Sequence, residues 1–449
     1  MRFATKFWKS KSFLSVWVFF LLLAPFGAHT STAEPTLHQV RIEELSKPIL
    51  AFDIANGSDL AAAALSDLRV RVWRLSSGQL LHEFSFPEPP TDQKLKLDNE
   101  YEPVSLRFSP DGKTLAVGFL NAIHLYNIET WDEEKNLTVA GEEKLRPGII
   151  ATPRTPELRR RTAEQAKAQS QQPMRDINQT MREWAAQRHQ GDGRTRIRDF
   201  TFTRDGLFIL ASYCGGGCWS SSGAVVAFPS GKAPVRLWDL RATKIVWEKL
   251  YDPHGVISRV VLPPDGGRFI AVNSELARCA VGAYDLRTGQ SLWSHPFGPC
   301  LSPPSIVVLP DGQSFITNRV EEANRKNKAW RYAAFYETAT GKKIADLPNA
   351  DGIAAADISS DGRWLASIIW RGTQFQIWEL QTKKIVIREV PKGWKRTADC
   401  VLNRVRLSPD NHWLVVGCNV RGDMAVYQWG EEHSPKRRVH GNSEQTTHH

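Results

Sequence analysis

The sequence contains none of the short motifs that identify the common enzyme classes. It has no Gly-x-Ser-x-Gly nucleophile elbow, no His-Glu-x-x-His zinc pair and no glycine-rich phosphate-binding loop. These absences leave no hydrolase, zinc protease or nucleotide-binding chemistry to assign from a motif. The sequence therefore predicts no catalytic residue, no metal site and no cofactor.

Long apolar runs are also scarce, and the one that stands out lies near the amino terminus. Phe13–Ala24 is a run of 12 residues behind a basic region, whereas a membrane-spanning helix needs about 20. The small residues at 31–33 fit a cleavage site. We predict a cleaved signal peptide at residues 1–33, export to the periplasm or the exterior, and no membrane span after cleavage. The alternative is an uncleaved segment that anchors the protein in the membrane.

A strong charge of either sign is missing. The formal net charge is +10, and removal of residues 1–33, which hold four basic and no acidic residues, lowers it to +6. This mild excess, together with export, argues against a nucleic-acid partner.

The most informative stretch present is Val104–Ile128, VSLRFSPDGKTLAVGFLNAIHLYNI. Its first residues alternate between apolar and polar side chains, which is the period of a β-strand. Ser109-Pro110-Asp111-Gly112 then supplies turn residues, and two more apolar segments follow. The stretch predicts three strands, and a meander of this size cannot bury both of its faces unless copies stack.

Looser copies of this stretch recur at intervals of about 40 to 50 residues, once one insertion is set aside. They begin at Ile49, Ile197, Ile257, Ser305, Ile353 and Val401. Together with the stretch above, they make about seven units.

The pattern resembles the WD40-like β-propeller family, which has SPDG-type turns and third strands such as Val235–Leu240, VRLWDL. The resemblance covers nearly all of the chain after residue 33. It implies an all-β fold, a monomeric seven-bladed β-propeller over residues 34–430. No Gly-His dipeptide precedes any unit, so the family's His–Asp network is not expected, and aromatic and aliphatic packing should hold the blades.

The two ends of the repeat region predict how the ring closes. The last unit stops after its third strand, near Trp429, and an alternating strand, Thr36–Leu45, precedes the first unit. We predict that this amino-terminal strand becomes the outer strand of the last blade and leaves no open sheet edge. Residues 431–449 are predicted to form a disordered tail.

A polar insertion at residues 132–195 follows the second unit. Thr155-Pro156-Glu157 has the residues of a helix start, and one apolar helical stripe follows, made of Met174, Ile177, Met181 and Trp184. The sequence predicts a partly helical insertion. Three interpretations stay open: a helix packed on the propeller, a docking helix for a partner protein, or disorder.

One fragment, Ala283–Trp293 (AYDLRTGQSLW), resembles the repeat of pyrroloquinoline-quinone propellers. In those proteins the repeat locks neighbouring blades and recurs in most of them. Because it occurs once in full here, we interpret it as blade packing and predict no quinone cofactor.

Counting back from the turn aspartates selects the first-strand side chains that should face the central channel. The set contains more arginine than acid, which does not suit a metal site. Its charged members of interest are Arg107, Asp199, Arg259, Arg404 and Arg406. One interpretation is a channel mouth that binds an anionic ligand or acidic peptide through Arg259 and Arg404. The other is that the arginines pair with Asp199, Asp357 or carbonyl groups and hold the blades together.

These features predict a non-catalytic protein–protein interaction scaffold in an exported compartment, with an unidentified protein partner. The step from propeller to scaffold is an analogy between folds. The alternative is an exported propeller enzyme, or a small-anion-binding protein, with its ligand in the central channel.

The six cysteines of an exported chain predict disulfides. In the resembled family, the loops that carry these cysteines open on one face of the disc. The resemblance implies that all six cluster on that face, and we hypothesise three local pairs: Cys214 with Cys218, Cys279 with Cys300, and Cys400 with Cys418. A peptide map of the non-reduced protein is expected to show these links, and any other connectivity would contradict the pairing.

Overall fold

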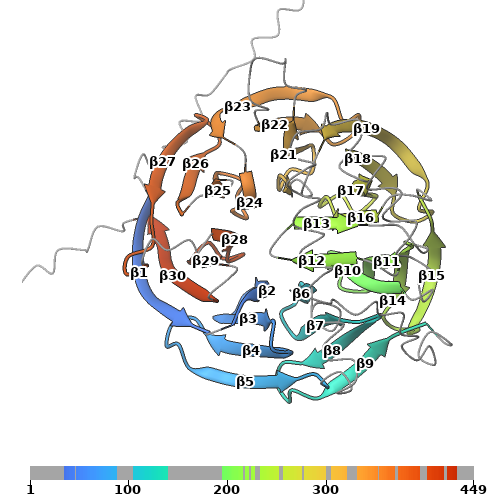
Figure 1. Cartoon of the computed structure of the whole chain (residues 1–449), viewed down its shortest axis with the longest axis horizontal. Coiled ribbons are helices and arrows are strands. Elements are labelled where there is room, and N and C mark those ends of the chain that lie inside the picture. Colours follow the sequence, from blue (N-terminus) through green and yellow to red (C-terminus); the bar gives the residue numbers. More distant parts are fainter. Residues whose placement is uncertain are drawn as a thin grey trace, which may run out of the picture.

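The computed structural model shows seven β-sheets arranged as blades around a central axis (Figure 1). It describes residues 35–45, 47–87, 105–139, 195–215, 218–221, 224–227, 233–251, 256–275, 278–299, 305–320, 331–351, 353–369, 373–394, 402–418 and 422–431. Within these ranges the regular elements are all strands, and the seven blades are four-stranded. The predicted all-β, seven-bladed β-propeller is confirmed.

Each blade runs from an inner first strand to an outer fourth strand (Figure 1). Blade 1 contains β2 (Ile49–Ile54), β3 (Leu60–Leu65), β4 (Arg69–Arg74) and β5 (Leu80–Ser85). Blade 2 contains β6 (Ser105–Phe108), β7 (Thr114–Phe119), β8 (Ala122–Asn127) and β9 (Glu133–Leu137). Blade 3 contains β10 (Thr195–Phe202), β11 (Phe208–Gly215), β14 (Val235–Asp239) and β15 (Lys244–Lys249).

The remaining blades follow the same order. Blade 4 contains β16 (Val256–Val261), β17 (Arg268–Glu275), β18 (Arg278–Asp285) and β19 (Ser291–Pro299). Blade 5 contains β20 (Ile306–Val308), β21 (Ser314–Val320), β22 (Arg331–Glu337) and β23 (Lys343–Asp351). Blade 6 contains β24 (Ile353–Ile358), β25 (Trp364–Ile369), β26 (Phe375–Glu379) and β27 (Lys384–Glu389). Blade 7 contains β28 (Leu402–Leu407), β29 (Trp413–Cys418), β30 (Asp423–Glu431) and β1 (Pro35–Glu44).

The ring closes through β1, as the sequence predicts. This strand pairs antiparallel with β30, from Pro35 opposite Glu431 to Glu44 opposite Asp423. It also holds both neighbouring blades. The Gln39 side chain donates to the Lys392 carbonyl at 2.9 Å and accepts from the Lys392 N–H at 2.7 Å, next to blade 6. On the other side, Arg41 donates to the Leu75 carbonyl of blade 1.

The connections define two faces of the disc, because successive strands are antiparallel. We call the face that carries the first-to-second and third-to-fourth connections the turn face, and the opposite one the loop face. On the turn face, the Ser109 hydroxyl and the Asp111 carboxylate accept from backbone N–H groups of Thr114 and Lys113. Gly112 adopts a φ of +70°, which favours glycine. The predicted turn is confirmed. The Ser109 hydroxyl donates a hydrogen bond to the Asp111 carboxylate, and this bond is the main cause that lowers the pKa of Asp111.

The hydrophobic core is divided into layers between neighbouring blades. One apolar cluster lies between each successive pair, including one between blades 7 and 1. The third-strand tryptophans Trp73, Trp238 and Trp378 are buried in these layers, which agrees with the aromatic packing that the sequence predicts. A blade therefore has no core of its own and needs both neighbours.

Tryptophans of two outer strands reach into the next blade. The Trp247 indole N–H donates to the Leu286 carbonyl at 2.9 Å, and the Trp293 N–H donates to the Thr338 carbonyl at 3.0 Å. Trp293 ends the fragment that resembles a quinone-propeller repeat. Its contact joins blades 4 and 5, which confirms the packing interpretation.

Three boundaries differ from the sequence prediction. The insertion was predicted from residue 132, but Glu133–Leu137 is the outer strand of blade 2, because alternation in such a charged segment is hard to recognise. Thr195 already belongs to β10, and Glu431 still belongs to β30. The predicted helix of the insertion lies outside the described residues.

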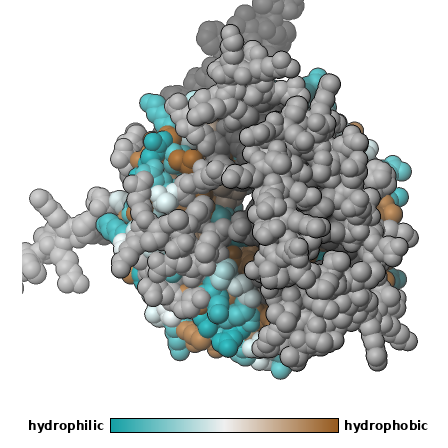
Figure 2. Space-filling model, in the orientation of Figure 1, coloured by the Kyte–Doolittle hydropathy of each residue, from teal (hydrophilic) through white to brown (hydrophobic). Residues whose placement is uncertain are grey.

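A small hairpin of β12 (Cys218–Ser221) and β13 (Ala224–Ala227) follows the second strand of blade 3. This hairpin was not predicted from the sequence. Figure 1 shows it projecting inward from the rest of the blade. In the space-filling view of the same side, hydrophilic and hydrophobic residues are interspersed where described residues are visible (Figure 2).

The closure predicts a contrast between two substitutions on β1. Leu37 packs against the core between blades 6 and 7, whereas Val40 lies at a bulge with 44% of its surface exposed. Leu37→Asp should lower the free energy of unfolding by about 2–3 kcal/mol, and Val40→Asp by less than about 0.5 kcal/mol. Urea denaturation measures both. Equal effects would contradict the role of β1 as an integral strand.

Candidate functional site: an arginine-rich central channel

The first strands of the blades surround the axis of the ring (Figure 1). In five of the seven, pairing with the second strand shifts by one residue, and such a bulge re-aims the side chains that follow it. Asp199, Arg259 and Arg404 come directly after three of these shifts. The sequence predicts all three as channel residues, and the contacts below bring their blades together.

Three aspartates join each of their blades to the next. Each is on a first strand and accepts a hydrogen bond from a backbone N–H of the following blade's first strand. The pairs are Asp53 with Phe108 at 2.9 Å, Asp199 with Val260 at 3.1 Å, and Asp357 with Leu407 at 2.9 Å. We call these contacts the aspartate bridges. Each links two blades at the axis, where a backbone N–H of an inner strand has no partner strand on its inner side.

Three of the predicted arginines also connect blades. Arg406 of blade 7 lies 3.4 Å from an Asp53 oxygen and 3.6 Å from an Asp357 oxygen, so it contacts blades 1 and 6. Arg107 Nη2 lies 3.4 Å from Asp199 Oδ1. Arg404 Nη2 donates to the Leu50 carbonyl of blade 1 at 2.6 Å. These contacts agree with the interpretation in which the arginines pair with aspartates and carbonyl groups and hold the blades together.

The cluster nevertheless holds more positive than negative charge. Its described members are five arginines and three aspartates, which gives a net charge of +2: Arg107, Arg198, Arg259, Arg404 and Arg406 against Asp53, Asp199 and Asp357. Among the residues that the structure describes, none makes a hydrogen bond or ion pair within 4 Å with Arg259. The Arg198 Nε atom is buried, also without a hydrogen-bond partner in the described part. The arginine charges therefore remain only partly compensated.

The pKa values of the channel arginines reflect the same excess of positive charge. Burial, and then repulsion from Arg259, Arg406, Arg198 and Arg107, lowers the pKa of Arg404 to about 9. Burial and the Arg259 charge lower the pKa of Arg198 to about 10. Arg406 differs: burial lowers its pKa, but its neighbouring aspartates outweigh this effect and raise it. An added anion would relieve the repulsion that Arg404 experiences.

A cavity opens where the channel meets the turn face. It has a volume of about 260 Å³, and its lining includes Asp53, Arg107, Thr201, Pro110 and Pro409. These residues come from blades 1, 2, 3 and 7. Of the channel arginines, Arg107 lines this space, which a small group could enter.

Two members of the cluster, Asp53 and Arg198, were not predicted from the sequence. Asp53 precedes a first turn, Asn56-Gly57-Ser58, that lacks the aspartate from which the other channel positions were counted. Its glycine also comes one residue earlier than in the other turns, so that counting back from the glycine selects Phe52 instead. Arg198 stands on the bulge itself, between Ile197 and Asp199, where a strict period of two assigns it to the wrong face.

Only some residues of the other predicted sites lie in the described part of the chain. Cys214, Cys279 and Cys418 are buried at the loop-face ends of their strands; Cys279 lies within β18 rather than in a loop, because that hairpin is long. Cys300 and Cys400 lie outside the described residues, so the pairing stays a prediction. The predicted docking stripe, Met174, Ile177, Met181 and Trp184, also lies outside them.

Two general features of the described chain bear on the site. In these residues, no group of three or more His, Cys, Asp or Glu side chains could hold a metal ion. The same part of the chain also contains no helix long and apolar enough to cross a membrane. No known family model matches the sequence, and a comparison with curated proteins also gave no match.

The aspartate bridges predict a large effect for a bridging carboxylate and a small one for a carboxylate on the surface. Asp199→Ala removes the acceptor of the Val260 N–H and the counter-charge of Arg107, and should lower the free energy of unfolding by about 2–4 kcal/mol. Asp265→Ala removes a surface ion pair with Arg268 and a long hydrogen bond from the Gly267 N–H, at 3.4 Å, and should cost less than about 1 kcal/mol. Urea denaturation at pH 7 measures both. Similar values would show that the bridge contributes no more than a surface pair.

Proposed function

We propose that the protein is a non-catalytic binding platform whose central channel accepts an acidic segment of a partner protein. The observation that carries this proposal is the partly compensated positive charge of the channel, in which Arg198 and Arg259 make no hydrogen bond or ion pair with any described residue. A rigid ring of seven blades keeps the arginines apart at low cost, so an incoming carboxylate meets a preorganised set of donors.

The chemistry of arginine supports an anionic ligand. A guanidinium offers a planar pair of N–H donors that matches a carboxylate, and such charge-assisted bonds are stronger than neutral ones. Arg107, Arg404 and Arg406 already use donors for blade contacts, which holds their side chains in place. Arg259 and Arg198 supply the free donors.

A peptide segment fits this site better than an isolated small anion. The cavity of about 260 Å³ at the turn-face mouth has a lining that combines Phe108, Phe202, Pro110 and Pro409 with Arg107 and Asp53. Such a mixed lining offers apolar contact beside the charges, as extended segments of proteins require.

The proposal also includes the setting of the protein. The basic and apolar residues 1–33 support export, and the even number of cysteines supports disulfides in an oxidising compartment. The SPDG-type turns and the seven blades support kinship with WD40-like propellers, whose members commonly bind other proteins.

The proposal is tested with a hexaglutamate peptide and with citrate as probes, by isothermal titration calorimetry at low ionic strength. We expect the peptide to bind more tightly than citrate and its affinity to fall as salt is added. Arg259→Gln should weaken peptide binding at least tenfold, because a hydrogen bond to a charged group contributes about 1.5–3 kcal/mol.

Arg287→Gln is the matched control, since Arg287 is exposed on the third-to-fourth-strand turn of blade 4. It should leave peptide binding unchanged. Tighter binding of citrate than of the peptide would favour the alternative, a protein for small anions. Absence of binding by both probes, or equal losses in the two variants, would overturn the proposal.

A further inference from the structure

A second feature of the fold lies between the outer strands of neighbouring blades. In three blades, the same register position on the fourth strand holds a side chain that reaches a carbonyl of the next blade. Trp247 is opposite Leu237, Trp293 opposite Ala283, and Lys135 opposite Leu125. Their acceptors, the carbonyls of Leu286, Thr338 and Leu240, each follow the third strand of the next blade. We call the space that Trp247 and Trp293 fill the tryptophan slot.

The next turn must leave room for the indole. Gly341 has a φ of +68°, and a Cβ atom added to it would lie 2.6 Å from Trp293. Gly289 has the same conformation, and a Cβ atom there would lie 3.2 Å from Trp247. A tryptophan on one blade and a glycine on the next therefore form a matched pair.

Between blades 5 and 6 this pair is replaced. The register position opposite Phe335 holds Ala345, so no indole comes from blade 5. The turn position of blade 6 holds Lys383, with a φ of +55°, where blades 4 and 5 have glycine. Among the described residues, no side chain donates a hydrogen bond to the Leu380 carbonyl, which is the acceptor that corresponds to Thr338.

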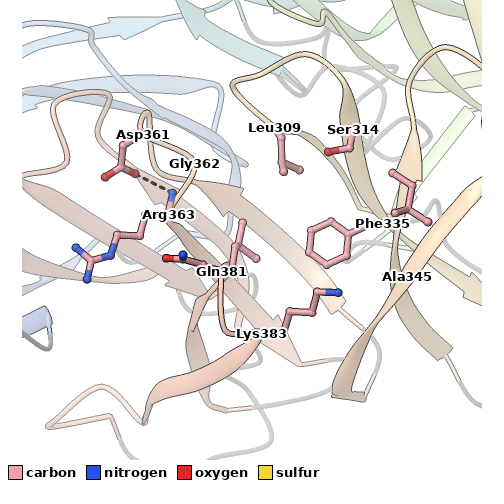
Figure 3. A pocket seen from close by; sticks show the side chains of 11 residues that line it. Leu309, Ser314, Phe335, Ala345, Asp361, Gly362, Arg363, Gln381 and Lys383 are labelled. Atoms are coloured by element: carbon pink, nitrogen blue, oxygen red, sulfur yellow. Dashed lines mark hydrogen bonds between the residues drawn. The ribbon is translucent and has the colours of Figure 1, made fainter. Parts of the chain in front are cut away.

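The result is an open cavity of about 600 Å³ on the turn face (Figure 3). Phe335 and Ala345 of blade 5 lie on one side of it and the turn of blade 6 on the other, with Leu309 and Leu380 adding apolar surface. Lys383 lies over the Phe335 ring, at 5.4 Å from its centre. Ile344, which is 58% exposed, belongs to the rim.

We propose that this cavity is an open tryptophan slot that binds a tryptophan side chain from a partner protein, presented on an acidic segment. The two sister slots of the same chain show that the space between outer strands accepts an indole and supplies a carbonyl for its N–H. Phe335 offers an aromatic wall for the incoming ring. This site is separate from the channel and does not rest on the function proposed for it.

Charge selects the residues beside the tryptophan. Lys383 makes no ion pair with any residue in the described ranges, whereas Arg363 is already paired with Glu379 at 3.5 Å. An acidic residue next to the tryptophan would pair with the Lys383 ammonium group. Displacement of Lys383 from the Phe335 ring would open the aromatic wall at the same time.

The test uses a fluorescently labelled Asp-Glu-Trp-Glu-Asp peptide and its anisotropy on titration with the full chain. The decisive variant combines Phe335→Ala, Ala345→Trp and Lys383→Gly, which copies the filled slot between blades 4 and 5. Because it restores a packing that the chain already uses, it should fold with a Tm no lower than that of the wild type. It should weaken peptide binding at least tenfold.

Two peptide analogues test the chemistry of the slot. Replacement of tryptophan by 1-methyltryptophan removes the N–H donor and should weaken binding about three- to tenfold, and phenylalanine should do the same. Lys383→Glu should weaken the binding of the acidic peptide about fivefold, but it should not weaken the binding of a version with Gln and Asn flanks. Arg259→Gln should leave the binding of the version with Gln and Asn flanks unchanged, which separates the slot from the channel.

Three outcomes would overturn the proposal. The first is equal binding by the wild type and the filled variant. The second is equal binding of the tryptophan, 1-methyltryptophan and phenylalanine peptides, because the slot would then not recognise an indole. The third is self-association of the wild type, measured by sedimentation, that the filled variant abolishes; a second copy would then be the occupant.

Discussion

The structure depends on contact between neighbouring blades, because no blade carries a core of its own. Seven apolar layers lie between the blades, and each draws its side chains from two of them. A chain of such layers is stable only when its ends meet. The pairing of β1 with β30 makes them meet, and Gln39 and Arg41 extend this strand's contacts to blades 6 and 1. Closure therefore depends on the whole chain, because the two strands that close the ring, β1 and β30, are about 390 residues apart in the sequence.

At the axis the same need for inter-blade contact is met by polar groups. First strands have a neighbour strand on one side only, so their inner N–H groups need acceptors from elsewhere. Asp53, Asp199 and Asp357 provide acceptors for three of them. The carboxylates in turn attract arginines, and the arginines outnumber them. The aspartates that satisfy the inner N–H groups thus leave a channel with an excess of positive charge. This excess is the physical reason to propose an anionic ligand.

At the periphery, the repeats show how one architecture tolerates different side chains. Blade 4 places a large residue on its outer strand and a small one opposite, Trp293 and Ala283. Blade 5 reverses the sizes, with Ala345 and Phe335. The following turn changes with them, from Gly341 to Lys383. Because the reversal does not refill the same volume, a cavity remains at this junction. Comparison of units within a single sequence therefore identifies a site that no short motif marks.

The sequence by itself determined the repeat, the turns and the closing strand, because these depend on local alternation and turn chemistry. Ser109-Pro110-Asp111-Gly112 and the strand around Leu37 could be recognised from neighbouring residues alone. It also identified Arg107, Asp199, Arg259, Arg404 and Arg406 as channel residues, since a period of two assigns side chains to a face. It did not determine which arginine pairs with which aspartate, nor the place of Asp53 and Arg198. Those depend on bulges and on how far each blade is rotated against the next, which only the tertiary structure decides. The same holds for the slot between blades 5 and 6: Ala345 and Lys383 are unremarkable until the packed ring brings them to one cavity.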